Sequence, residues 1–253
     1  MTLFTRLVLA SCFLTGLSNG QTLPNPTNIS GQGSFLNLSG SGFIADNFLD
    51  DGYAAGADLY GAPAGLLPTA ERGNAFLQWG SPVTTGDHSS ALWYQRLYSS
   101  NVALDEPFDV AYLYYRNGTL GEGPGIGGFD LQIVLNRPVI SLPNNLNPTV
   151  TSFAVGLLDT PDTGSAAQNA DSVLLQQNYF LSPFKDSADH PYYFKVSFAD
   201  PSGATIANPT SFAVNEGEVG RVTVKGVFTT VPEPSAAVLG GLGALVLFRR
   251  RRG

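Results

Sequence analysis

The stretch that decides the fold is Phe129-Asp130-Leu131-Gln132-Ile133-Val134-Leu135. Apolar side chains recur at every second position from Phe129, and Asp130 and Gln132 fall between them. Successive side chains of a β-strand point to opposite faces, so this alternation predicts a strand with one buried face.

Other segments show a similar pattern. Residues 194–198 and 221–225 alternate in the same way, and residues 108–115 are rich in aromatic and branched side chains. The last segment leads into Asn117-Gly118, a pair that tolerates positive φ and predicts a β-hairpin. The best candidate for a helix is Asp171–Tyr179, although no segment keeps helical periodicity for three clear turns.

Clusters of glycine and proline separate these segments, at residues 61–68, 121–128, 138–148 and 201–209. An apolar fraction of 43% with 13% charged residues excludes a disordered chain, which would be richer in charge. Many short strands with turns between them predict one all-β domain. We expect a two-sheet β-sandwich with jelly-roll-like connections.

The N-terminus has the features of a secretory signal peptide, which we assign to residues 1–20. Arg6 precedes an apolar run over residues 7–17, and small residues follow at 18–20. The run is too short to span a hydrocarbon core about 30 Å thick. The alternative is a lipoprotein signal, because residues 9–12 have a lipobox-like form that would make Cys12 the lipidated residue.

The C-terminal tail, residues 231–253, contains three signals in series. Pro232, Glu233 and Pro234 come first, and an apolar segment over residues 235–248 follows. The tail then carries four adjacent basic residues, Arg249, Arg250, Arg251 and Arg252. An arginine cluster suits the cytoplasmic edge of a transmembrane helix in the inner membrane. The alternative is a buried terminal helix, which the same arginines disfavour.

This tail resembles the PEP-CTERM sorting signal of exported proteins in Gram-negative bacteria, through Pro232, Glu233, Pro234, the apolar segment and the arginine cluster. The resemblance implies that a membrane-embedded processing enzyme, an exosortase, recognises the motif and removes the tail. Before that cleavage the Sec translocon would export the chain, and residues 235–248 would hold the precursor in the inner membrane for a time.

Residues 21–230 form the predicted exported domain. They contain 8 basic and 19 acidic side chains, which give a net charge of −11. Such a charge repels phosphate backbones, so we expect no nucleic acid partner. The single cysteine, Cys12, lies in the signal peptide, so this domain has neither a disulfide nor a thiol nucleophile.

A second resemblance runs from about residue 31 to residue 230. Short motifs at 76–80, 108–119, 159–162 and 212–217 look like those of the choice-of-anchor K type domain. The resemblance implies an exported β domain with exchangeable anchors and unassigned function. It carries no catalytic residues over to this chain.

The sequence contains no recognisable catalytic constellation. His88 and His190 lack the spacing of metal ligands, and no G-x-S-x-G elbow supplies a nucleophile. Four glutamates are candidates for the carboxyl pair of a glycosidase, without a spacing that selects two of them: Glu106, Glu122, Glu216 and Glu218. We therefore expect a protein that is not an enzyme and holds no cofactor.

Two groups of aspartates could supply oxygen ligands to a structural Ca²⁺ ion: Asp46, Asp50, Asp51 and Asp58, and Asp159, Asp162 and Asp171. Neither group has the ligand order of an EF-hand. The alternative interpretation is that these aspartates cap backbone N–H groups in turns, and we favour it.

Aromatic residues suggest a platform on which sugar rings could stack, formed by Trp79, Trp93, Tyr112 and Tyr114. Tyr112 and Tyr114 are two positions apart and so share one face of a strand. The alternative is that these aromatics pack between the sheets, as aromatics do in most sandwiches, and this interpretation has the greater weight.

These observations predict an exported structural or interaction protein of the cell surface or extracellular matrix. The alternatives are a secreted carbohydrate-binding module and a secreted glycoside-active enzyme. The expected partners are the Sec translocon, an exosortase-type enzyme, the inner membrane and an extracellular polysaccharide.

Overall fold

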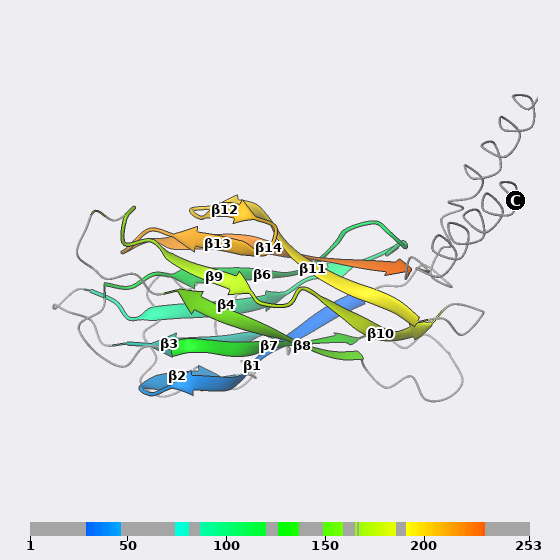
Figure 1. Ribbon diagram of the computed structural model, residues 1–253, viewed down its shortest axis with the longest axis horizontal. Coiled ribbons are helices and arrows are strands. Elements are labelled where there is room, and N and C mark those ends of the chain that lie inside the picture. Colours follow the sequence, from blue (N-terminus) through cyan, green and yellow to red (C-terminus); the bar gives the residue numbers. More distant parts are fainter. Residues whose placement is uncertain are drawn as a thin grey trace, which may run out of the picture.

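The computed structural model describes residues 29–46, 74–80, 87–119, 126–136, 149–158, 165, 167–185 and 191–230. The regular secondary structure in these ranges consists of β-strands, which run roughly along the longest axis in Figure 1. No described segment is a helix long and apolar enough to cross a membrane. The predicted signal peptide and the sorting tail lie outside the described residues.

The strands form two sheets, here named A and B. The order in sheet A is β12 (Thr205–Asn208), β13 (Ser211–Val214), β9 (Asp171–Leu175), β8 (Thr149–Leu158), β7 (Ile126–Asn136), β1 (Ile29–Gly40) and β5 (Tyr98–Ser99). The order in sheet B is β10 (Tyr179–Lys185), β11 (Pro191–Ser202), β14 (Val219–Thr230), β6 (Phe108–Arg116), β4 (Ser90–Arg96), β3 (Ala75–Trp79) and β2 (Phe43–Asp46).

Every pairing between these strands is antiparallel. The expectation of an all-β protein with two antiparallel sheets is therefore confirmed. The narrower jelly-roll assignment stays a prediction, as do the domain boundaries at residues 20 and 230.

The core lies between the sheets and uses the alternation seen in the sequence. In β7 the apolar side chains from Phe129 to Leu135 at every second position are at most 3% exposed, whereas Asp130 and Gln132 are half-buried on the other face. Phe194 of sheet B meets Phe153 of sheet A with ring centroids 6.2 Å apart. Aromatic rings thus join the two layers.

Two tyrosine hydroxyls also join the sheets through the core. Tyr94 of β4 donates a hydrogen bond of 3.0 Å to the carbonyl oxygen of Gly31 in β1. Tyr115 of β6 donates one of 3.0 Å to the carboxylate of Asp171 in β9. A buried hydroxyl and a buried carboxylate each need a partner, so these bonds fix how one sheet lies on the other.

The hairpin prediction at Asn117-Gly118 is wrong, because β6 belongs to sheet B and β7 to sheet A. Asn117 is instead a buried bridge whose side-chain amide donates to the carbonyl oxygens of Asn169 and Val214, at 3.1 and 3.0 Å. A Cβ at Gly118 would collide with the carbonyl oxygen of His88. The pair is thus selected for close packing at the crossing rather than for a two-residue turn.

The helix prediction for Asp171–Tyr179 is also wrong, since Asp171–Leu175 forms strand β9 between β8 and β13. Val173 and Leu175 enter the core at 0% and 4% exposure, whereas Leu174 is 42% exposed. This short segment has period two, and pairing on both sides satisfies its backbone in a way that a single helical turn cannot.

Candidate functional site

The outer face of sheet B, which points away from sheet A, contains a ladder of large side chains. The register places Phe76, Trp93, Tyr114 and Arg221 side by side across β3, β4, β6 and β14. Their sequence neighbours on the other face belong to the hydrophobic core, among them Leu77, Leu92, Leu113 and Val222. The ladder therefore lies outside the hydrophobic core, on the outer face of sheet B.

The two tryptophans of the predicted sugar platform are buried. Trp79 is 4% exposed and stacks on Tyr115 in the core, with ring centroids 5.9 Å apart, because it shares a face with Ala75 and Leu77. Trp93 belongs to the ladder but is 0% exposed, with Phe76 at 5.7 Å. A sugar ring therefore cannot stack on either indole in this arrangement, so these two residues do not fit the platform interpretation. The packing of Trp79 in the core agrees with the interpretation that was given the greater weight.

Trp93 is also covered by a cation. The guanidinium carbon of Arg116 lies 5.3 Å from the centroid of the Trp93 ring, and Arg116 is 1% exposed. Its Nε donates a 2.7 Å hydrogen bond to the carbonyl oxygen of Ser89. Arg116 is thus a structural cation beside the ladder, held by the Trp93 ring and a backbone oxygen.

Tyr112 and Tyr114 are the members of the platform that retain exposure, and both are half-buried. Their rings meet edge to face, with centroids 6.2 Å apart and planes at 72°. The hydroxyl of Tyr114 donates to Oε1 of Gln95 at 3.3 Å. The expectation that they lie on one face agrees with the outward alternation along β6.

Arg221 completes this group, and the sequence analysis missed it. Its guanidinium carbon lies 4.6 Å from the centroid of the Tyr112 ring, and its Nε is buried without a hydrogen-bond partner. Burial raises the pKa of Tyr114, while a hydrogen bond from Arg221 and its positive charge oppose this rise. We name Tyr112, Tyr114, Gln95 and Arg221 the tyrosine–arginine cluster.

Next to this cluster, a lysine bridges two aspartates across three strands. Lys225 Nζ of β14 lies 2.8 Å from Asp109 of β6 and 2.9 Å from Asp200 of β11. The hydrogen bond to Asp109 is the main cause of a raised pKa at Lys225, and the hydrogen bond from Lys225 lowers the pKa of Asp200. Lys225 and Asp200 therefore stay charged at neutral pH, and one lysine set against two aspartates leaves the group with a formal charge of −1.

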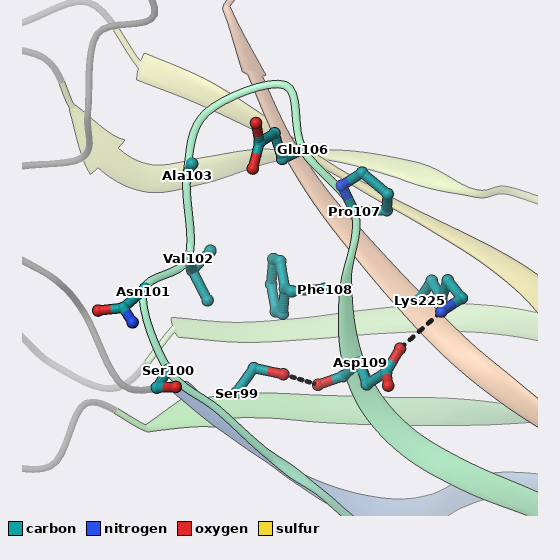
Figure 2. A pocket seen from close by; sticks show the side chains of 10 residues that line it. All are labelled: Ser99, Ser100, Asn101, Val102, Ala103, Glu106, Pro107, Phe108, Asp109 and Lys225. Carbon is teal, nitrogen blue, oxygen red and sulfur yellow. Dashed lines mark hydrogen bonds and ion pairs between the residues drawn. The ribbon is translucent and has the colours of Figure 1, made fainter.

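An open polar pocket of about 350 Å³ lies beside this ion pair, where the chain enters β6. Figure 2 shows the side chains of Val102 and Phe108 pointing into the space enclosed by the loop 100–107, with Asp109 and Lys225 at one side. The hydroxyl of Ser99 donates to the backbone oxygen of Asp109 at 2.7 Å. The pocket is lined by Ser99, Ser100, Asn101, Val102, Ala103, Glu106, Pro107, Phe108, Asp109 and Lys225.

The three candidate glutamates that the structure describes have different surroundings. Glu106 lines the pocket, whereas Glu216 accepts a hydrogen bond from Asn169 and Glu218 accepts one from Asn215. Glu122 lies outside the described residues. Glu106 is thus the glutamate that the described structure places at a cavity, with Asp109 as its acidic neighbour.

The predicted calcium groups are only partly described. Asp46 and Asp171 are placed by the structure, and Asp171 accepts its hydrogen bond from Tyr115 in the core. The other aspartates of both groups, and His190, lie outside the described residues. Among the residues that are described, no group of three or more His, Cys, Asp or Glu side chains could hold a metal ion.

Comparison with known proteins finds one family model, the PEP-CTERM protein-sorting motif, which matches residues 230–252. The match includes Pro232, Glu233, Pro234 and the four arginines. It fits an exported protein that an exosortase processes, and it implies a precursor that passes through the membrane. No curated protein matches the chain. The resemblance of residues 31–230 to the choice-of-anchor K type domain stays a prediction.

Proposed function

We propose that this protein is a structural or interaction protein of the cell surface or extracellular matrix, released from a transient inner-membrane anchor by an exosortase. The sorting motif at residues 230–252 is the observation that carries the proposal. In this proposal the protein acts by binding and has no catalytic activity.

The exported domain supports this role through its construction. Two antiparallel sheets with a continuous core give a stable body without a disulfide, because the cysteine lies in the signal peptide. The acidic charge of residues 21–230 keeps such a body soluble and apart from anionic lipids. The domain can therefore leave the membrane once the anchor is cut.

The test follows the tail through the cell. Cells expressing the full chain are fractionated, the domain is followed with an antibody, and the intact mass of the released form is measured. Release requires cleavage before Arg249–Arg252, so the released mass should lack the arginines. Glu233→Ala should leave an unprocessed precursor in the membrane fraction, because Glu233 is the charged residue of the motif.

Glu218→Ala is the matched control, since it removes the same side chain from the exported domain outside the motif. This variant should be released like the wild type. If the released wild-type protein keeps the four arginines, or if Glu233→Ala is released normally, the sorting proposal is wrong. The tail would then be a permanent anchor.

A further inference from the structure

Positive charge gathers on the outer face of sheet B. Three of the five basic side chains that the structure describes, Lys195, Arg221 and Lys225, lie on the neighbouring strands β11 and β14. Lys225 lies between two aspartates on the same face, so these three groups carry a formal charge of −1, whereas Lys195 and Arg221 form no ion pair with another described residue. In a domain of net charge −11, this face is the part suited to an anion.

Aromatic side chains accompany these cations at both ends of the face. Tyr179 of β10 and Tyr193 of β11 pack edge to face, with centroids 6.0 Å apart, and Tyr179 is 56% exposed. Tyr179 lies directly opposite Lys195, and so on the same outer face. One end of the face thus carries two tyrosines and a lysine, and the other end carries the tyrosine–arginine cluster, so each end combines aromatic rings with a cation.

The two ends are separated by a distance that suits a polymer. The register sets Tyr112 level with Ala199 and Tyr179 level with Lys195, so the separation along the strands equals the length from Lys195 to Ala199 in β11. At roughly 3.3 Å per residue this length is about 13 Å. A small molecule would meet one end, whereas an extended chain can meet both.

The chemistry of the cluster defines what such a chain must offer. The flat apolar faces of Tyr112 and Tyr114 suit the C–H faces of sugar rings. A guanidinium held against a tyrosine ring presents a rigid fork of donors that matches a carboxylate. The Nε of Arg221 is buried, so the terminal nitrogens of this half-buried side chain are the donors that a ligand can reach. A sugar ring with a carboxylate satisfies both groups at once.

We propose that the outer face of β6, β11 and β14 binds an acidic polysaccharide, a chain that contains uronic acids. One carboxylate pairs with Arg221 while its ring lies on Tyr112, and a second segment of the chain meets Lys195 and Tyr179. The inference rests on the proposed function in one respect, because export brings this face to where such polymers occur.

The test measures binding to immobilised alginate, a polymer of uronic acids, by the full chain in a neutral detergent. Dextran, an uncharged polysaccharide, is the comparison surface. The wild-type chain should bind alginate and not dextran. Arg221→Ala and Tyr112→Ala should each weaken alginate binding about tenfold or more, the range expected when a charge-assisted hydrogen bond or a stacked ring is lost.

Two further variants make the test specific. Arg221→Lys keeps the charge but loses the planar fork, so it should retain part of the affinity and serves if Arg221→Ala does not fold. Tyr98→Ala is the matched control, because Tyr98 is 60% exposed and also lies under an arginine, Arg96, at 4.9 Å, but belongs to β5 of sheet A. It should bind like the wild type.

Each alternative outcome overturns the proposal. A folded wild-type chain that does not bind alginate excludes this ligand class, and equal binding to dextran shows that the carboxylate is not recognised. Equal losses for Tyr98→Ala and Tyr112→Ala place binding elsewhere. None of these results depends on cleavage of the tail, so the sorting proposal is tested independently of the binding proposal.

Discussion

Asn117 offers the sharpest test of how the two sheets are joined. Its side-chain amide donates to the carbonyl oxygens of Asn169 and Val214, and the residue is 2% exposed. Its backbone N–H donates to Glu218, and its own carbonyl oxygen accepts from Gly217. One residue thus links the end of β6 to the segments before β9 and β14 and to the end of β13.

Two substitutions at Asn117 separate hydrogen bonding from size. Asn117→Ala leaves two buried carbonyl oxygens each short of one donor, and at about 1–2 kcal/mol for each group the loss is about 3 kcal/mol. Asn117→Asp keeps the volume but sets a carboxylate oxygen about 3 Å from the same two acceptors, by the distances of the bonds it replaces. We expect Asn117→Asp to be at least as destabilising as Asn117→Ala.

The assay is urea unfolding of the full chain in a neutral detergent. Tryptophan fluorescence reports it, because Trp79 and Trp93 are both buried. Asn215→Ala is the control, since its amide bonds to an exposed partner, Glu218, and its effect should stay below about 1 kcal/mol. If Asn117→Asp is clearly more stable than Asn117→Ala, packing rather than donation explains the residue and the reasoning fails.

Two more predictions use the same unfolding assay. Tyr115→Phe removes the hydrogen bond to the Asp171 carboxylate and should cost about 2 kcal/mol, as for other bonds to charged groups; an unchanged midpoint would show that this bond does not join the sheets. Gly33→Ala drives a Cβ into the ring of Tyr94 and should cost about 1–3 kcal/mol, whereas Gly127→Ala, whose nearest atom is 3.6 Å away, should change stability by about 0.5 kcal/mol or less. Equal effects of the two glycine changes would contradict the packing argument.

The fold class could be predicted because it depends on a local pattern. Residues 129–135 alternate strictly, and a strand with one buried face is the conformation that separates such side chains. The sorting tail is similarly local, since its proline motif, apolar segment and arginines are read as linear sequence. Neither prediction needs to know which distant residues meet.

Predictions that depended on a partner strand were wrong or incomplete. Asn117-Gly118 has the composition of a hairpin turn, yet the strands on either side enter different sheets. For Asp171–Tyr179 the alternation was too short to exclude a helix. Pairing with β8 and β13 stabilises residues 171–175 as a strand. In both cases long-range pairing outweighed a weak local preference.

The sequence by itself determined that this chain is rich in β-strands and carries a sorting signal, because both features depend only on patterns of neighbouring residues. The tertiary structure alone decided which face each aromatic occupies in the assembled sheets. Trp79 enters the core with Leu77, whereas Tyr112 and Tyr114 face outward and meet Arg221, more than a hundred residues away in the chain. Such a meeting depends on the order and register of β6 and β14, which no single segment specifies.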